Sequence, residues 1–102
     1  IFKDPERLLD VFVVDTSGGL EAVRLTDLLR RSNLRVDRSF GNRSMKAQMK
    51  AADKSGAHLA LIVGEDEVHK DVVTIRDLRG EQGQVEVPSN SLVENLRKRL
   101  HD

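Results

Sequence analysis

Apolar residues in this chain gather in short runs that are separated by polar segments of helix length. Two runs, residues 8–15 (LLDVFVVD) and 58–63 (HLALIV), are nearly continuous and rich in Val, Leu and Ile, which predicts strands buried on both faces. Residues 34–40 alternate in character, which predicts a half-buried strand. Two further strands are predicted at residues 71–78 and at the shorter run 84–87.

Three segments between these runs carry apolar residues at helical spacing. Residues 20–32 form the first predicted helix, with one apolar stripe made of Ala22, Leu25, Leu28 and Leu29. Residues 43–55 form the second, and Gly56 ends it because glycine suits the left-handed position after a helix. Ser91 and Glu94 can form a capping box for the last helix, whose apolar face contains Leu92, Val93, Leu96 and Leu100.

The order of these elements predicts the topology. Strand-helix-strand units need parallel strands joined by right-handed crossovers, so the first three strands should be parallel. Residues 64–70 (GEDEVHK) form an acidic turn in this interpretation, and seven residues are too few for a crossover. The fourth strand should therefore run antiparallel to the third. The fold class predicted is α/β, a three-layer α/β/α domain with a five-stranded mixed sheet.

Composition narrows the functions that this domain can have. The chain has 102 residues, enough for one domain and one core, and 17 basic residues balance 17 acidic ones. A neutral chain argues against unspecific coating of nucleic acid but allows a local basic patch. The absence of Cys excludes disulfides and thiolate metal sites, and the absence of Tyr and Trp argues against an aromatic platform that stacks several bases. The start without Met leads us to expect an excised domain of a longer cytoplasmic protein.

The second predicted helix carries basic residues along a single stripe. At about 100° per residue, its apolar residues fall on the opposite side, toward the sheet. A stripe without interleaved Glu favours contact with several phosphates of one backbone over a merely solvated helix face, although both interpretations stand. The stripe contains Arg43, Lys46, Lys50 and Lys54, and the side predicted to face the sheet contains Met45, Met49 and Ala52.

The acidic turn and the fourth strand carry groups that can read bases. Glu65, Asp66 and Glu67 follow the third strand, at the end of an α/β sheet where ligands bind. Carboxylates repel phosphate but accept hydrogen bonds from base amino groups. Arg76 lies on the return strand, which can bring its planar fork back near the same rim. An ordinary surface turn with a cross-strand ion pair is the alternative.

Other chemistries find little support in the sequence. His58, His69 and His101 lack metal-ligand spacing to one another. The Ser17-Gly18-Gly19 turn lacks the fingerprint of a phosphate loop and is better interpreted as a helix cap. A phospho-acceptor receiver domain would need an acidic pair after the first strand and a lysine in the fifth, and neither is present.

Together these segments resemble a known family. The run from Arg43 to Lys50 (RSMKAQMK), the GEDE turn at residues 64–67 and VTIRDL at 73–78 are similar to the C-terminal anticodon-binding domain of histidyl-tRNA synthetase. The resemblance extends over essentially all of residues 1–102. It implies a sheet order of 2-1-3-4-5 with the fourth strand antiparallel. It also implies contacts of Glu67 and Arg76 with anticodon bases, and of Arg43, Lys46 and Lys50 with the tRNA backbone.

The resemblance further implies what this domain does and what lies outside it. Its partner would be the anticodon stem-loop of histidine tRNA, and aminoacylation would occur in a separate catalytic domain that uses ATP and Mg. This domain would have neither catalytic residues nor a cofactor of its own. The parent would dimerise mainly through the missing part, so the isolated domain would be a monomer. The alternative is a protein-interaction module of the same fold that binds no RNA.

Overall fold

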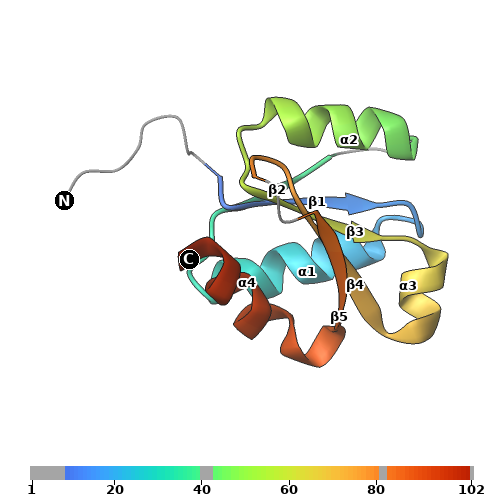
Figure 1. Ribbon diagram of the computed structural model, residues 1–102. Helices are drawn as coiled ribbons and strands as arrows, with labels where there is room; N and C mark the ends of the chain where they lie inside the picture. The colour runs from blue at the N-terminus through green and yellow to red at the C-terminus, as the bar shows by residue number, and fades with distance from the viewer. Residues whose placement is uncertain (1–8, 40–42, 81–82, 102) are drawn as a thin grey trace.

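The computed structural model describes residues 9–39, 43–80 and 83–101. Strands and helices alternate in the first half, and two adjacent strands and a helix complete the chain (Figure 1). The elements are β1 (Val11–Asp15), α1 (Leu20–Arg31), β2 (Val36–Arg38), α2 (Met45–Lys54), β3 (Leu59–Val63), α3 (Glu65–Lys70), β4 (Val72–Asp77), β5 (Gln84–Pro88), the 3-10 turn η1 (Ser89–Ser91) and α4 (Leu92–His101).

The five strands form one mixed sheet in the order β2-β1-β3-β4-β5. The β1 strand is parallel to both of its neighbours, β2 and β3, whereas β4 is antiparallel to β3 and to β5. The predicted order and the predicted antiparallel fourth strand are both confirmed.

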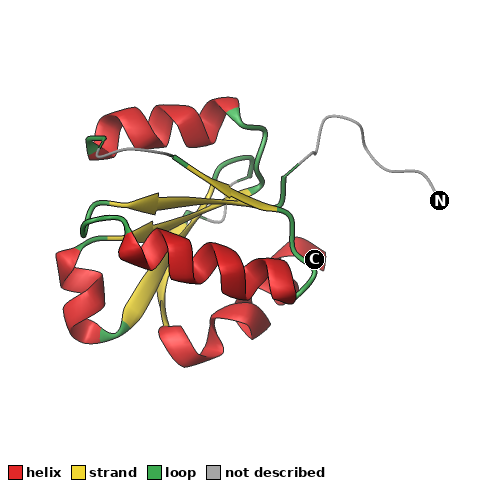
Figure 2. Ribbon diagram, turned by 180° about the vertical axis from the view of Figure 1, so that it is seen from behind, coloured by secondary structure: helices red, strands yellow, loops and turns green. Residues whose placement is uncertain are grey.

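Helices cover the two faces of the sheet in separate layers. Figures 1 and 2 show α2 on one side and α1 with α4 on the other. Successive strand residues point to opposite faces, so β1 contributes to both sides of the core. Val11 and Val13 join the α1 and α4 side, and Phe12 and Val14 pack with Ala52 of α2. The predicted three-layer α/β/α arrangement is confirmed.

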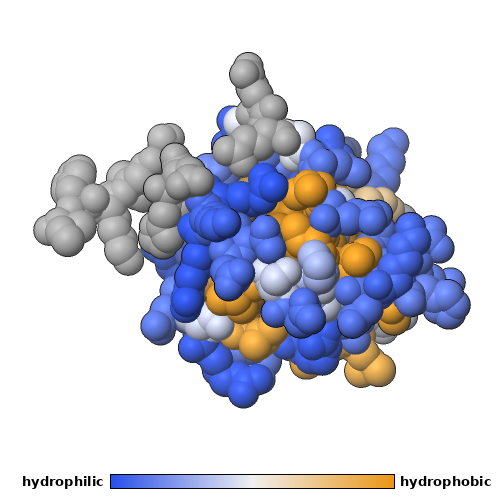
Figure 3. All heavy atoms as spheres, turned by 60° about the horizontal axis from the view of Figure 1, so that its bottom comes forward, coloured by the Kyte–Doolittle hydropathy of each residue, from blue (hydrophilic) through white to orange (hydrophobic). Residues whose placement is uncertain are grey.

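The outer surface of these layers is mainly polar. Figure 3, in which the lower side of Figure 1 comes forward, shows hydrophilic residues over most of that face with apolar patches between them. Among the described residues, no helix is both long enough and apolar enough to cross a membrane.

Residues 65–70 form the short helix α3, so the prediction of a simple acidic turn was wrong. The side chain of Glu67 reaches back, and its Oε1 accepts a hydrogen bond from the Gly64 N–H at 2.7 Å. Three carboxylates lie in the first turn and His69 and Lys70 in the last, which suits the helix dipole at both ends. The connection is still too short for a crossover, which is why the antiparallel prediction holds.

Three local predictions about α2 and α4 need correction. The α2 helix begins at Met45, because the Ser44 hydroxyl caps it by accepting the Ala47 N–H at 3.2 Å. Met45 does not face the sheet; it lies in the first turn and is 41% exposed. Before α4, the Ser91 hydroxyl donates to the Pro88 carbonyl oxygen at 3.3 Å in place of the predicted capping box.

Two predicted strand boundaries also change. The first strand begins at Val11, and the predicted start at Leu8 lies outside the described residues. The second strand comprises only Val36–Arg38, and the predicted end at Phe40 likewise lies outside them.

Candidate nucleic-acid interface

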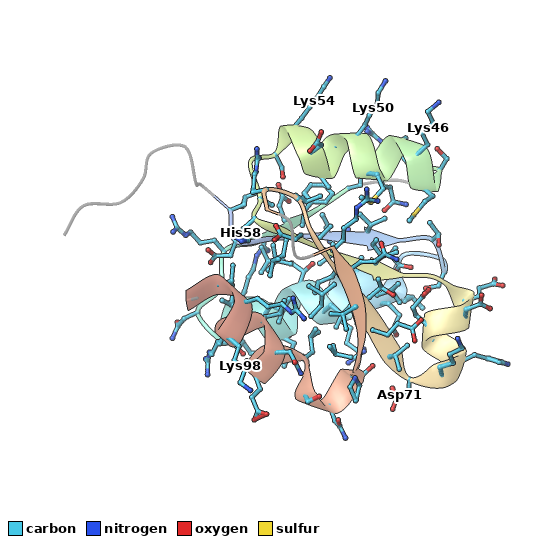
Figure 4. All side chains as sticks on the ribbon, viewed as in Figure 1. Lys46, Lys50, Lys54, His58, Asp71 and Lys98 are labelled. Atoms are coloured by element: carbon cyan, nitrogen blue, oxygen red, sulfur yellow. The ribbon has the colours of Figure 1, made fainter. Side chains whose placement is uncertain are left out.

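The outer face of α2 presents a row of lysines. Lys46, Lys50 and Lys54 are exposed, follow one another at intervals of four residues, and point away from the sheet (Figure 4). Four residues advance about 6 Å along a helix, so the ammonium groups stand at regular steps. Within the described residues none of the three forms an ion pair. The three lysines of the predicted stripe therefore form one cationic surface on α2.

Arg43 stands at the entrance to this stripe and not on it. It is exposed and precedes the cap residue Ser44, so its side chain is not held in helical register with the lysines. Its main-chain carbonyl is nevertheless fixed, because it accepts a hydrogen bond from Gln48 Nε2 at 2.9 Å.

Gln48 fastens α2 to the sheet. Its side chain is 4% exposed and lies against the end of β1. The amide oxygen Oε1 accepts the Asp15 N–H at 2.9 Å, and the amide Nε2 donates to the Asp15 carbonyl at 2.8 Å. The β1–β2 pairing stops at Val13, so β2 offers no partner to the backbone of Asp15. Gln48 forms hydrogen bonds with the N–H and C=O groups of Asp15 instead. Sequence analysis missed this residue; a polar side chain on the sheet-facing side of α2 was the available signal.

The Asp15 carboxylate organises the neighbouring turn into α1. Its oxygens accept the Ser17 N–H at 2.7 Å, the Ser17 hydroxyl at 2.6 Å and the Ala22 N–H at 2.9 Å. The turn Ser17-Gly18-Gly19 does hold the cap position of α1, as predicted, but its hydroxyl does not cap the helix. Gly19 occupies the cap position with φ 99°, and the carboxylate of Asp15 supplies the acceptor.

Glu67 and Arg76 lie on the same side of the sheet, the side that α2 covers. Glu67 Oε2 accepts the Thr74 hydroxyl at 3.4 Å. Thr74 points toward the α2 side, because its neighbours Val73 and Ile75 belong to the core under α1 and α4. Arg76 follows two residues later on the same face and is exposed.

Arg76 was predicted to lie near the same rim of the sheet as Glu67, and this prediction was wrong. Arg76 pairs with Ala60, near the beginning of β3, whereas Glu67 lies beyond the carboxyl end of that strand. Thr74 lies between them, and one such step along a strand spans about 6.6 Å. Glu67 on α3 and Arg76 on β4 are therefore separated along the direction of β4.

Arg76 instead shares a groove with the lysine stripe. The groove has a volume of about 320 Å³, runs between α2 and β4, and is lined by Met49, Lys50, Asp53, Arg76, Asp77 and Leu78. The fold thus brings together Lys50 and Arg76, for which the sequence predicted separate tasks. Asp53 is a further lining residue that sequence analysis missed; its place one helical turn after Met49, which was predicted to face the sheet, was the available signal.

A second hollow has a different character. It lies between the start of α1 and α3, measures about 470 Å³, and is lined by Ser17, Leu20, Glu21, Glu65, Asp66, Val68 and His69. Glu21 bonds Arg24, and this hydrogen bond raises the pKa of the Arg24 guanidinium. The exposed carboxylates of Glu65 and Asp66 disfavour phosphate here. This hollow therefore differs in charge from the lysine row of α2.

Metal coordination finds no ready site in the described part of the chain. No group of three or more His, Cys, Asp or Glu side chains comes together there. His58 Nε2 lies 4.0 Å from Asp77 Oδ1, which is a single pair and not a cluster of metal ligands.

Comparison with known proteins identifies the family. Residues 10–99 match the family described as anticodon binding domain. A histidine–tRNA ligase from Corynebacterium kroppenstedtii is 47% identical over 72 residues, which are 71% of this chain and 17% of the relative. This chain spans about a fifth of the length of the curated relatives it matches.

Solved structures agree with the sequence relatives. The apo histidyl-tRNA synthetase of S. aureus superposes with a TM-score of 0.81 at 27% identity, covering 95% of this chain and 25% of that one. The histidyl-tRNA synthetase of Nostoc sp. gives 0.78 at 33% identity, covering 91% and 23%. The chain therefore belongs to the family of anticodon-binding domains, and the predicted resemblance to the C-terminal domain of histidyl-tRNA synthetase is confirmed.

Proposed function

We propose that this domain binds the anticodon stem-loop of histidine tRNA as part of a longer histidyl-tRNA synthetase. The observation that carries the proposal is the exposed lysine row of α2 beside the groove that contains Arg76. A row of basic side chains binds a phosphate backbone, and neighbouring hydrogen-bond donors and acceptors can read unstacked bases. The lack of Trp and Tyr fits reading by hydrogen bonds better than by stacking.

The proposed roles follow the position of each side chain. Lys46, Lys50 and Arg43 contact phosphates, and Glu67 and Arg76 contact anticodon bases. The separate catalytic domain of the parent would use ATP and Mg to aminoacylate the tRNA in the cytoplasm. The parent would form its dimer through that part, which leaves the isolated domain monomeric.

Lys46→Ala tests the phosphate contacts. Binding of a fluorescent histidine anticodon stem-loop is measured from low to moderate salt, and the salt slope should flatten by about 0.7–0.9 for each phosphate that the variant no longer neutralises. Lys98→Ala is the matched control, since Lys98 is exposed on α4, far from α2 (Figure 4). Equal slopes for the wild type and the two variants would contradict a phosphate role for the stripe.

Glu67→Gln tests base reading more cleanly than Glu67→Ala. Glu67 Oε1 also holds the Gly64 N–H at the start of α3, and glutamine keeps an acceptor there. Discrimination between matched and mismatched loops should fall more than total affinity does. Equal losses for both kinds of loop would exclude the role in reading.

A second candidate function is a protein-interaction module. The supporting observation is the hollow between α1 and α3, where Leu20 is 82% and Val68 46% exposed beside carboxylates. A contiguous exposed apolar patch with a polar rim is typical of protein contacts. A wild-type domain that fails to bind the stem-loop even at low salt would favour this second function.

A further inference from the structure

We infer that the groove between α2 and β4 holds one unstacked nucleotide of the RNA, and that Asp53 selects its base through an amino group. The inference rests on the proposed function and adds a site and a specificity residue to it. It starts from the side chains that the fold brings together from α2 and β4.

The groove suits a single nucleotide in size and in lining. Its volume of about 320 Å³ is small enough to exclude a duplex and lies at the lower end of sites for small ligands. Met49 and Leu78 are half-buried and pack against the core on the α2 side. They offer an apolar surface for the flat face of a base in a domain that has few aromatic residues.

The charges around the groove indicate which part of the nucleotide enters. Lys50 belongs to the outer lysine row, so a phosphate lying against that row stays at the groove's edge. Asp53 lines the same groove on the following turn of α2, across from Arg76. A carboxylate repels phosphate at short range, whereas it accepts hydrogen bonds from the exocyclic amino groups of adenine, cytosine and guanine. The base edge, and not the phosphate, therefore faces Asp53.

The two carboxylates of the groove differ in their availability. Asp77 Oδ1 accepts the Arg79 N–H at 3.0 Å and the Gly80 N–H at 2.8 Å, so it serves the turn after β4. Asp53 is exposed, and within the described residues its side chain takes part in no hydrogen bond or ion pair. Uracil carries no amino group and is the base that Asp53 should disfavour.

The test compares Asp53→Ala with the wild-type domain on a set of stem-loops, because asparagine would keep an amide oxygen that can still accept a hydrogen bond from a base amino group. The set contains the histidine anticodon stem-loop and variants in which each loop base that bears an amino group is changed in turn to uracil. Wild-type protein should lose about tenfold in affinity at one loop position, the range expected for one specific base contact. Asp53→Ala should weaken the unchanged loop by a similar factor and leave that uracil variant unaffected.

Each other result overturns the inference. A gain in affinity for every loop would mean that Asp53 repels phosphate in a phosphate site. Unchanged affinity for every loop would mean that Asp53 is only solvated. Asp27→Ala, at an exposed aspartate on α1, is the matched control and should alter no loop preference. A wild-type domain that shows no salt-dependent binding to any loop would instead refute the proposed function itself.

Discussion

Replacing Gln48 by methionine is expected to lower the free energy of unfolding by about 2–4 kcal/mol. The substitution keeps the length of the side chain but removes both of its hydrogen bonds with the Asp15 backbone. Asp15 is 7% exposed, so its N–H and C=O groups would lose partners where water has little access. The carbonyl of Arg43 also loses its bond, but it lies near solvent and can be hydrated.

The magnitude follows from these two buried groups. Each costs about 2 kcal/mol when left without a partner, the middle of the usual range, and more favourable burial of the thioether offsets up to about 2 kcal/mol of the sum of about 4 kcal/mol. With a urea m-value of about 2 kcal/mol/M, the unfolding midpoint should fall by about 1–2 M. Far-UV circular dichroism is the suitable probe because the chain has neither Trp nor Tyr.

Gln84→Met provides a control with identical chemistry. Gln84 is exposed on β5, and a surface substitution of this kind should change stability by less than about 0.5 kcal/mol. Equal shifts of the urea midpoint for Gln48→Met and Gln84→Met would refute the reasoning, because burial and backbone hydrogen bonds are what distinguish the two glutamines.

Three further changes test other parts of the fold, each by urea unfolding. Leu61→Ala, at a fully buried position in the centre of β3, should cost about 2–5 kcal/mol, and a loss below about 1 kcal/mol would contradict tight packing there. Asp15→Asn leaves one amide oxygen for donors that two carboxylate oxygens accept, so we expect a loss of about 1–3 kcal/mol; an unchanged midpoint would argue against the role of this carboxylate in the turn. Leu20→Ser should stay within about 0.5 kcal/mol because Leu20 is 82% exposed, and a large loss would place its side chain against the core.

Much of the fold was predictable because it depends on short-range patterns. Continuous Val, Leu and Ile runs identify β1 and β3 as central strands, since only strands covered on both faces can bury every side chain. The length of the segment between β3 and β4 decides that β4 is antiparallel, whether that segment is a turn or the short helix α3. Helical periodicity likewise predicted that Lys46, Lys50 and Lys54 share the outer face of α2.

The candidate site was less predictable, because its residues come from α2 and β4, which are separate in the sequence and meet only in the folded domain. Register pairs Arg76 with Ala60, and α2 lies over this part of the sheet, so Arg76 meets Lys50 and Asp53 instead of the rim near Glu67. A local pattern does not contain that register.

The sequence by itself determined the elements, their order and the sign of the charge on α2, because periodicity and chain length act within one segment. Only the tertiary structure decided which polar side chains become buried partners and which line a groove. Gln48 shows the physical reason: its amide is buried because β2 ends before Asp15 and leaves two backbone groups that need a partner.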